Sequence, residues 1–324
     1  MKKNTKILLT GAGGPAAICA FKSLSDHDFE IHMADMDGLS AGLYFVPDTQ
    51  RHVIPSAKHP DFVQIMLNLC KANSIDILIP TVDFELEQLA LNRDLFELYD
   101  IQLLLAEHDV LQKIMNKYNL LNAVFQTVDV GQFDMLAHAE EKDWKGKKIV
   151  VKPISGSGSR GVCFYEDYSE IPESSFDNDL LMIQEFASGP EYSVDVMIGK
   201  NGEVKAAVPR VRMRTDSGVS VTGKIENNKR VIEYVKQVVG AIGLTYMANV
   251  QVIDSPECGP RLIEINPRFS GGLSLVIASG ANTPLMSINE LLGKEVATVH
   301  EFKEIAMVRS FTETFMNAED LITA

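Results

Sequence analysis

The chain has 324 residues, of which 46% are hydrophobic and 23% charged, proportions typical of a globular protein with a substantial core. Its net charge of −14 and pI near 5.0 argue against a nucleic-acid-binding protein, which normally presents a basic surface. No apolar run approaches the about 20 residues of a membrane span, and the four cysteines form no C-x-x-C pair. We therefore expect a cytoplasmic protein with reduced thiols.

The first hundred residues alternate short apolar strands with helices. A strand at 6–10, a glycine-bearing loop, a helix and a second strand at 30–37 form a βαβ opening of the kind that begins dinucleotide-binding domains. An NAD site would use Gly11, Gly13 and the acidic Asp35, but Ala16 stands where G-x-G-x-x-G requires its third glycine. An NAD-dependent oxidoreductase is therefore kept only as an alternative.

Further strands at 52–54, 75–80 and 101–105, with helices at 60–73 and 85–95, complete this domain near residue 108. Polar side chains follow the strand 75–80, namely Thr81, Asp83 and Glu85. Ligands of α/β sheets bind beyond the carboxyl ends of the strands, so these side chains suit a non-nucleotide substrate. Alternatively, Thr81 or Asp83 caps the following helix.

The middle of the chain carries lysines and a glycine-rich loop. A helix predicted at 110–122 contains Lys113 and Lys117. Residues 149–162, IVVKPISGSGSRGV, predict a strand containing Lys152 and then a loop with Gly156, Gly158 and Gly161. Glycines let the backbone approach phosphate, and a lysine adds positive charge, although the Walker A pattern is absent. A flexible hairpin with solvated lysines is the alternative.

A second apolar strand follows about 30 residues later and ends at Gln184, Glu185 and Phe186. A turn at Gly189–Pro190 leads into another strand that begins at Glu191 and alternates polar with apolar residues.

Residues 208–224 place Arg210, Arg212 and Arg214 at alternate positions, which puts them on one face of a strand. Neighbouring cations repel one another unless an anion faces them, so in an acidic protein they indicate ATP, a carboxylate or an acyl phosphate. A solvated edge strand is the alternative.

After a helix predicted at 229–242, residues 249–268 form two strands joined by a loop at 255–260. Folding about this loop places Gln251 opposite Glu264, while Glu264 and Asn266 share one face because side chains alternate along a strand. Three oxygen-bearing side chains beside Arg268 suit a Mg²⁺ ion that holds phosphate oxygens. An amphipathic hairpin with a solvated polar face is the alternative.

These segments, in this order, resemble the ATP-grasp superfamily, and most of all one synthetase half of the carbamoyl-phosphate synthetase large subunit. The resemblance rests on Lys117 and on the segments VVKPISGSGSRGV, IQEFASGPEYSVDV, NVQV and LIEINPRFSGG. It implies a mixed α/β and α+β fold. The expected parts are a Rossmann-like pre-ATP-grasp domain at 1–108, a small lid subdomain with the glycine-rich loop at 109–182, and a C-terminal subdomain with the metal site at 183–324.

The resemblance also implies roles for individual residues. The ATP phosphates would be held by Lys117, Lys152, Gly156, Gly158 and Gly161. The backbone at Glu185 and Phe186 would bind adenine, and Glu191 would bind the ribose. Mg²⁺, or Mn²⁺ in its place, would be bound by Gln251, Glu264 and Asn266. Many ATP-grasp enzymes carry an acidic residue at the position of Gln251, so the number of ions stays open. The expected catalytic residues are Arg268, Lys152, Arg210 and Arg212.

The implied activity is an ATP- and Mg²⁺-dependent ligase that joins a small carboxylate, carbamate or bicarbonate to an amine or ammonia through an acyl phosphate. One alternative is a split carbamoyl-phosphate synthetase subunit, although the chain has room for a single ATP-grasp unit. An alternative of another class is a nucleotide-binding module without turnover. The resemblance suggests a homodimer or a partner synthetase subunit, and we expect neither nucleic acid nor membrane as a partner.

Overall fold

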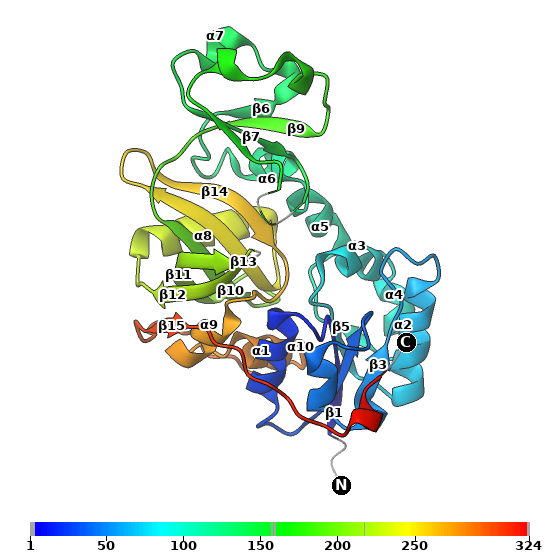
Figure 1. Ribbon diagram of the computed structural model, residues 1–324. Helices are drawn as coiled ribbons and strands as arrows, with labels where there is room; N and C mark the ends of the chain where they lie inside the picture. Colours follow the sequence, from blue (N-terminus) through cyan, green and yellow to red (C-terminus); the bar gives the residue numbers. More distant parts are fainter. Residues whose placement is uncertain (1–3, 157, 159, 217, 323–324) are drawn as a thin grey trace.

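The computed structural model of the protein describes residues 4–156, 158, 160–216 and 218–322. Within this part of the chain, three β-sheets organise the fold (Figure 1). Sheet A is parallel and belongs to the N-terminal domain, sheet B forms a small lid, and the antiparallel sheet C lies between them. No helix in the described residues is long and apolar enough to cross a membrane.

Sheet A is buried on both faces, as expected for parallel strands covered by helices. Its strands, in spatial order, are β3 (Arg51–Val53), β2 (Phe29–Asp35), β1 (Thr5–Thr10), β4 (Ile77–Ile79) and β5 (Gln102–Leu103). The covering helices are α1 (Pro15–Leu24), α2 (Phe62–Asn73), α3 (Asp83–Leu91) and α4 (Arg93–Glu97). The predicted strands are confirmed, whereas the helix predicted at 85–95 is divided at Asn92 into α3 and α4.

The single helix predicted at 110–122 is wrong, because two helices occupy this region. Helix α5 (His108–Ile114) ends before Asn116, and α6 (Lys117–Val124) begins after it. The Asn116 side chain accepts a hydrogen bond from the backbone N–H of Asn119 at 3.0 Å, which caps a new helix. Lys117 is therefore the first residue of α6, while Lys113 remains on α5 and pairs with Asp109.

The lid is built on sheet B, whose order is β6 (Phe133–Met135), β9 (Leu181–Glu185), β7 (Ile149–Pro153) and β8 (Cys163–Tyr165). One face of this sheet packs on a small core that includes Trp144 of α7 (Glu141–Trp144) and Ile183. Strand β9 pairs with both β6 and β7 and runs to Glu185.

Sheet C has the order β14 (Gly259–Asn266), β13 (Tyr246–Ser255), β10 (Glu191–Ile198), β11 (Val204–Asp216), β12 (Val219–Ile225) and β15 (Ala306–Val308). Helix α8 (Lys229–Ile242), found where its apolar stripe predicted it, packs on one face. Helices α9 (Leu273–Ser279) and α10 (Thr283–Leu291) cover part of the other face.

The β13–β14 hairpin has the predicted register at its functional end but not at its loop. Gln251 lies opposite Glu264 and Asn249 opposite Asn266. A register shift after Gln251 then places Asp254 opposite Pro260, where an unbroken pairing would place Arg261. The irregularity is a β-bulge beside the polar residues, a position at which bulges commonly redirect side chains.

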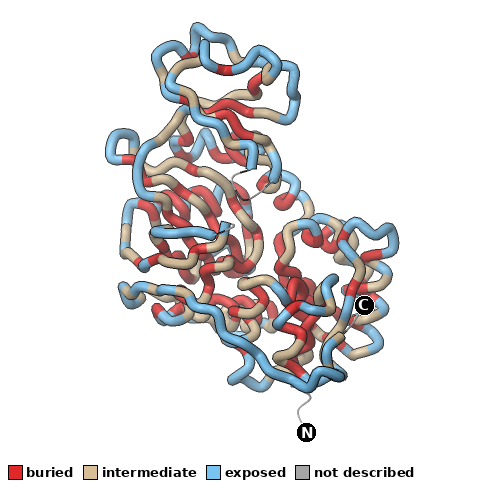
Figure 2. Tube along the Cα trace, in the orientation of Figure 1, coloured by how far each residue is buried: buried red, intermediate tan, exposed pale blue. Residues whose placement is uncertain are grey.

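The chain ends in an extended, exposed segment that returns to the N-terminal domain (Figures 1 and 2). Near its end, the backbone N–H of Ile322 donates to the Tyr44 hydroxyl at 3.0 Å, and Arg51 donates to the carbonyl oxygen of Asp320 at 3.4 Å. Burial concentrates instead in the three sheets and the helices that cover them (Figure 2).

Candidate active site

One face of sheet C carries a cluster of polar residues on its four strands nearest the lid. Cross-strand pairing places on this face Glu191, Ser193 and Asp195 of β10, Arg210 and Arg212 of β11, Asn249 and Gln251 of β13, and Glu264 and Asn266 of β14. The alternate residues of β10 point the other way into the core that α8 covers. A polar face of this size between two domains is a candidate ligand site.

The lid presents a matching surface. Ile149, Val151 and Ile183 face the small lid core. Because side chains alternate along a strand, the opposite face of sheet B carries Lys152, Gln184, Val150 and Phe164, as the pairing of β7 with β8 and β9 requires. This face therefore combines a buried lysine with apolar and aromatic surface.

Lys152 is 5% exposed, and its ammonium donates to the Gln184 side-chain oxygen at 2.7 Å. Burial, together with the nearby charge of Lys117, lowers the pKa of Lys152 to about 8, while Glu264 opposes the shift. A buried lysine beside another cation is stabilised in its protonated form by a nearby anion. A phosphate group would supply such an anion.

Lys117 joins the lid to the polar face of sheet C. Its ammonium lies 2.7 Å from the carbonyl oxygen of Gly156 and 3.3 Å from a carboxylate oxygen of Glu264. Gln251 and Asn266 donate their side-chain amides to the other Glu264 oxygen, at 2.9 and 3.2 Å. The lysine, the glycine loop and the three predicted metal ligands therefore meet at one point.

The three predicted loop glycines all have positive φ, 112° at Gly156, 73° at Gly158 and 72° at Gly161. A Cβ atom at Gly156 or Gly158 would meet nothing within 4 Å, so their backbone borders open space. A ligand can approach main-chain groups closely at such a position. Ser157 and Ser159 of the same motif lie outside the described residues.

Two arginines of β11, Arg210 and Arg212, are each paired with a carboxylate of the protein. Arg210, which is 3% exposed, binds Asp195 at 2.7 Å and the hydroxyls of Ser193 and Ser270 at 3.0 Å. Arg210 thus ties sheet C to the loop that follows β14.

Arg212 pairs with Glu191 and donates to the Gln251 side chain at 3.1 Å. Glu191, predicted to bind ribose, is therefore engaged with a protein cation in this structure. Arg214 follows a register shift in β11 and is exposed, so the prediction that the three arginines share one face is wrong for Arg214.

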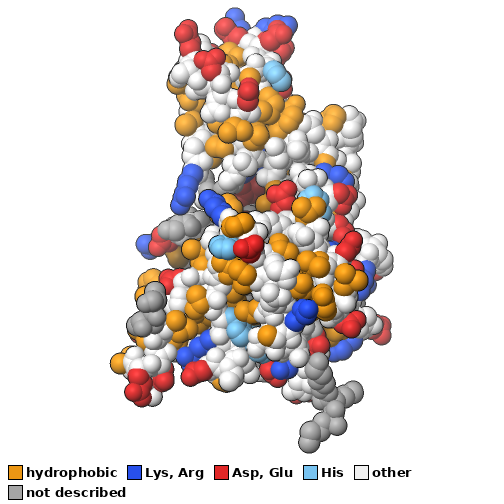
Figure 3. Space-filling view, turned by 90° about the vertical axis from the view of Figure 1, so that its right-hand side faces the viewer, with side chains coloured by type: hydrophobic (Ala, Val, Ile, Leu, Met, Phe, Trp, Pro, Cys, Tyr) orange, Lys and Arg blue, Asp and Glu red, His pale blue; other side chains and the backbone are white. Residues whose placement is uncertain are grey.

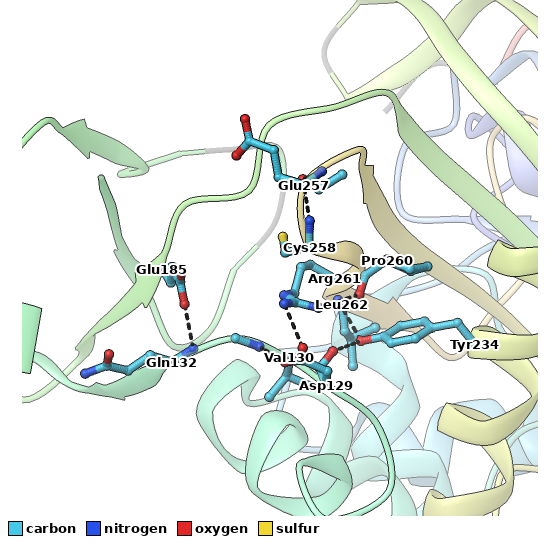
Figure 4. A network of polar contacts seen from close by, with 12 residues as sticks. Asp129, Val130, Gln132, Glu185, Tyr234, Glu257, Cys258, Pro260, Arg261 and Leu262 are labelled. Carbon is cyan, nitrogen blue, oxygen red and sulfur yellow. Dashed lines mark hydrogen bonds and ion pairs between the residues drawn. The ribbon is translucent and has the colours of Figure 1, made fainter. Parts of the chain in front are cut away.

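The predicted adenine hinge is also engaged in protein contacts. The backbone N–H of Glu185 donates to Gln132 at 2.8 Å and that of Phe186 to Lys148 at 3.0 Å, so neither N–H is free for a base here. The neighbouring linker is held by the contacts in Figure 4. There Arg261 pairs with Asp129 at 2.7 Å, and the Tyr234 hydroxyl donates to the Asp129 carbonyl oxygen at 2.9 Å. These contacts fix the linker through which the chain enters the lid.

Arg268 is one of the expected catalytic residues, and here it forms an ion pair with the N-terminal domain. Its Nε and Nη2 atoms each lie 2.7 Å from the Asp83 carboxylate. Asp83 does not cap α3, whose N-cap residue is Val82. The structure thus pairs Arg268 with Asp83, a residue of the N-terminal domain that the sequence pattern did not connect with it.

At the carboxyl edge of sheet A, Glu85 is a buried acid. Burial raises the pKa of Glu85 to about 7, opposed by a hydrogen bond from the Thr10 hydroxyl. In the glycine loop, the N–H of Gly13 donates to Asp35 at 2.8 Å and that of Gly14 to the Gly11 carbonyl at 2.8 Å. The N–H of Gly13, which an NAD site would use, is therefore engaged by Asp35 in this structure.

Sequence patterns did not indicate two residues of the site. Phe164 is 65% exposed on the inner lid face, with its ring edge-on to Phe186 at a centroid distance of 5.7 Å. Only its position in a short strand after the glycine loop could have indicated it. Asn249 is 4% exposed, and its side-chain nitrogen has no hydrogen-bond partner among the described residues. An orphaned buried amide beside Asn266 is a potential donor to a ligand.

The molecular surface agrees with a site between the lid and the body. In the view of Figure 3, the surface is hollowed where the lid meets the rest of the molecule, with charged side chains beside the hollow. The paired residues described above link this region to the lid through Lys117 and to the N-terminal domain through Asp83.

Comparison with known families and proteins gives matches over most of the chain. Residues 177–314 match the family described as ATP-grasp in the biosynthetic pathway with Ter operon, and residues 7–104 match the PylC-like N-terminal domain. An uncharacterized protein, y4rH, of Sinorhizobium fredii is 27% identical over 140 residues. That alignment covers 39% of this chain and only 29% of the relative's length.

Solved structures of several enzymes share the fold. A biotin carboxylase from Campylobacter jejuni superposes with a TM-score of 0.74 at 15% identity, covering 93% of this chain and 74% of that one. N5-carboxyaminoimidazole synthetase from Staphylococcus aureus, complexed with ADP, gives 0.74 at 14% identity, with 94% and 82% covered. L-amino acid ligase from Bacillus licheniformis gives 0.67 at 16% identity, with 90% and 75% covered. Residues 177–314 therefore match an ATP-grasp family and residues 7–104 a PylC-like N-terminal domain, and the chain has the ATP-grasp fold.

Proposed function

We propose that this protein is an ATP- and Mg²⁺-dependent ligase that joins a carboxylate to an amine. The observation that carries the proposal is the position of the Lys117 ammonium, which lies 2.7 Å from the Gly156 carbonyl oxygen and 3.3 Å from a carboxylate oxygen of Glu264. The charges of Lys117 and Glu264 both affect the pKa of the buried Lys152. Phosphate-binding cations, a glycine loop and a carboxylate with neighbouring amides are the parts that phosphoryl transfer from ATP requires.

The proposed reaction has two steps. A carboxylate oxygen of the substrate attacks the γ-phosphorus of ATP, and ADP leaves to give an acyl phosphate. The amine nitrogen then attacks the acyl carbon, inorganic phosphate leaves, and the nitrogen loses a proton to form the amide. No protein nucleophile is needed, so positioning and charge stabilisation are the work of the site.

Lys117 is assigned to the ATP phosphates because it contacts the open backbone of the glycine loop at Gly156, and Lys152 because it is buried within range of the charge of Lys117. Phe164 and Phe186 offer an aromatic surface to the adenine base at the outer end of the same lid face. When ATP binds, its negative charge replaces Glu264 as the partner of Lys117 and holds Lys152 in its charged form.

The donor set fits a magnesium ion only with help from the nucleotide. Glu264 offers a carboxylate, and Asn266 and Gln251 offer amide oxygens, which are hard ligands suited to Mg²⁺. In the described residues no three His, Cys, Asp or Glu side chains converge on one point. An ion here would therefore depend on phosphate oxygens to complete its shell, and it would neutralise charge on the transferring phosphate.

The test is ADP release from Mg-ATP with a panel of carboxylates and bicarbonate, each with and without amines or ammonia, and with products identified by mass spectrometry. The proposal expects ADP only with a particular carboxylate–amine pair, together with an amide. ADP with bicarbonate alone would favour the carbamoyl-phosphate synthetase-like alternative. Tight ATP binding without turnover under any combination would favour the nucleotide-binding module.

Glu264→Gln tests the assignment of the site. The expected result is a fall in kcat of at least about 100-fold, the scale on which loss of a contact to the transition state slows an enzyme. Glu233→Gln is the matched control, because Glu233 pairs with Lys236 on the exposed face of α8. Equal ADP release by Glu264→Gln and Glu233→Gln would refute the assignment.

A further inference from the structure

Arg268 lies at the junction of two domains and is held there by a carboxylate from the other one. Asp83 is the first residue of α3 in the N-terminal domain, 185 positions away along the chain. Its two carboxylate oxygens accept hydrogen bonds from Nε and Nη2 of Arg268, each at 2.7 Å. This bidentate arrangement fixes the plane as well as the position of the guanidinium.

The pairing leaves another edge of the guanidinium available. Asp83 occupies the edge formed by Nε and Nη2, while Nη1 donates to the carbonyl oxygen of Phe269 at 3.1 Å. Nη1 and Nη2 each carry two N–H groups, so each retains one beyond these bonds. Arg268 is 20% exposed and Asp83 32%, so the group is still accessible to a ligand.

The backbone that carries Arg268 is fixed from two further directions. Arg210 of β11 donates to the Ser270 hydroxyl at 3.0 Å, and Arg309, which follows β15, donates to the Gly271 carbonyl at 2.6 Å. A Cβ atom at Gly272 would lie 2.2 Å from Nη1 of Arg210, so the loop packs directly on that guanidinium. With the loop held in this way, the remaining freedom of Arg268 is that of its side chain, which Asp83 restricts.

We propose that Asp83 is a positioning residue that aims the free edge of Arg268 at the transferring phosphoryl group. The inference rests on the proposed function, and it adds a residue from the N-terminal domain to the machinery of the ATP-grasp site. It also implies that Arg268 is correctly oriented only while the N-terminal domain is seated against the loop that follows β14. In the opposite role, Asp83 would mask Arg268 from the substrate, and removing its charge would raise kcat instead of lowering it.

The experiment is a double-mutant cycle with Asp83→Asn, Arg268→Ala and the double variant. Asp83→Asn keeps the size of the side chain but cannot accept both guanidinium bonds. It should lower kcat about 10- to 100-fold, the range that misplacement of a catalytic group produces, while the KM for ATP stays within about 3-fold. In the Arg268→Ala background, the same substitution should change kcat less than about 2-fold, because its partner is absent.

Asp48→Asn is the matched control. Asp48 also pairs with an arginine of the N-terminal domain, Arg51, and neither residue belongs to the proposed site. It should leave kcat unchanged, and thermal unfolding of every variant checks that each is folded. Independent, additive effects of Asp83→Asn and Arg268→Ala would overturn the proposal. An increase in kcat with Asp83→Asn would overturn it in favour of masking.

A second cycle needs no turnover. The four proteins are titrated with inorganic phosphate in the presence of Mg-ADP, and phosphate affinity should fall about 10-fold in each single variant and no further in the double variant. If the wild-type protein releases no ADP with any substrate pair, the proposed function fails, while this cycle still decides the role of Asp83. Phosphate affinity that is unaffected by Asp83→Asn but reduced by Arg268→Ala would overturn the positioning role.

Discussion

Raising the pH should weaken ATP binding, because Lys152 loses its proton near pH 8. The pKa of this lysine lies below its ordinary value of 10.5 in the folded protein, so the ammonium is present below about pH 8 and is lost as the pH rises through that value. From about pH 7 to about pH 9 the protonated fraction falls from about 0.9 to about 0.1. If only that form binds the phosphates, the apparent Kd for ATP rises about 10-fold.

Isothermal titration with Mg-ATP across this range measures the effect, and ATP itself keeps its full charge because a terminal phosphate titrates near pH 6. Lys152→Arg keeps its charge and should abolish the pH dependence, while Lys152→Met should bind weakly at every pH. Lys236→Met, a change on the exposed face of α8, should retain the wild-type slope. If the apparent Kd for ATP still depended on pH as in the wild type in both Lys152 variants, the assignment of this lysine to the phosphates would be refuted.

Three further predictions follow from burial and close packing. Because burial raises the pKa of Glu85 from 4.5 to about 7, the native state loses up to about 3 kcal/mol of stability as the pH rises through this interval. Urea unfolding at about pH 5 and pH 8 should show this loss in the wild type but not in Glu85→Gln. An equal change in the free energy of unfolding in both proteins would contradict the prediction. Gly272→Ala should destabilise by about 1–3 kcal/mol because its Cβ would lie 2.2 Å from the held guanidinium of Arg210, whereas Gly240→Ala, with open space in α8, should stabilise by up to about 1 kcal/mol. Phe164→Ala should weaken ATP binding at least about 5-fold through lost stacking, with affinity for inorganic triphosphate unchanged; an equal loss for both ligands would exclude a contact with the base.

The local elements were predictable from the sequence because their signals lie within a few residues. The apolar stripe of 229–242 predicted α8 at its observed bounds, and the alternation of the hairpin placed Gln251 opposite Glu264. The glycines of 156–161 indicated a loop, and in the structure all three have a positive φ. A helix break also has a local signal, and Asn116 as a cap was overlooked in favour of one continuous helix.

The charge pairing of the site could not be predicted in the same way. Arg210 and Arg212 face Asp195 and Glu191 only because β10 and β11 are neighbours in sheet C, which no single segment specifies. The bulge after Gln251 likewise depends on how β14 pairs and packs, since nothing in the alternation of β13 marks it.

Most of the strands and helices, and the residue types of the candidate site, were predictable from the sequence, because hydrophobic period, glycine and loop spacing act over short distances. The contacts that these residues make depend on the tertiary structure. Lys117 reaches Glu264 and Gly156, and Arg268 reaches Asp83 across 185 positions, because three sheets bring their polar faces together. Domain packing determines which ion pairs these charged residues form, so their roles depend on their neighbours in the folded protein and not on their positions in the sequence.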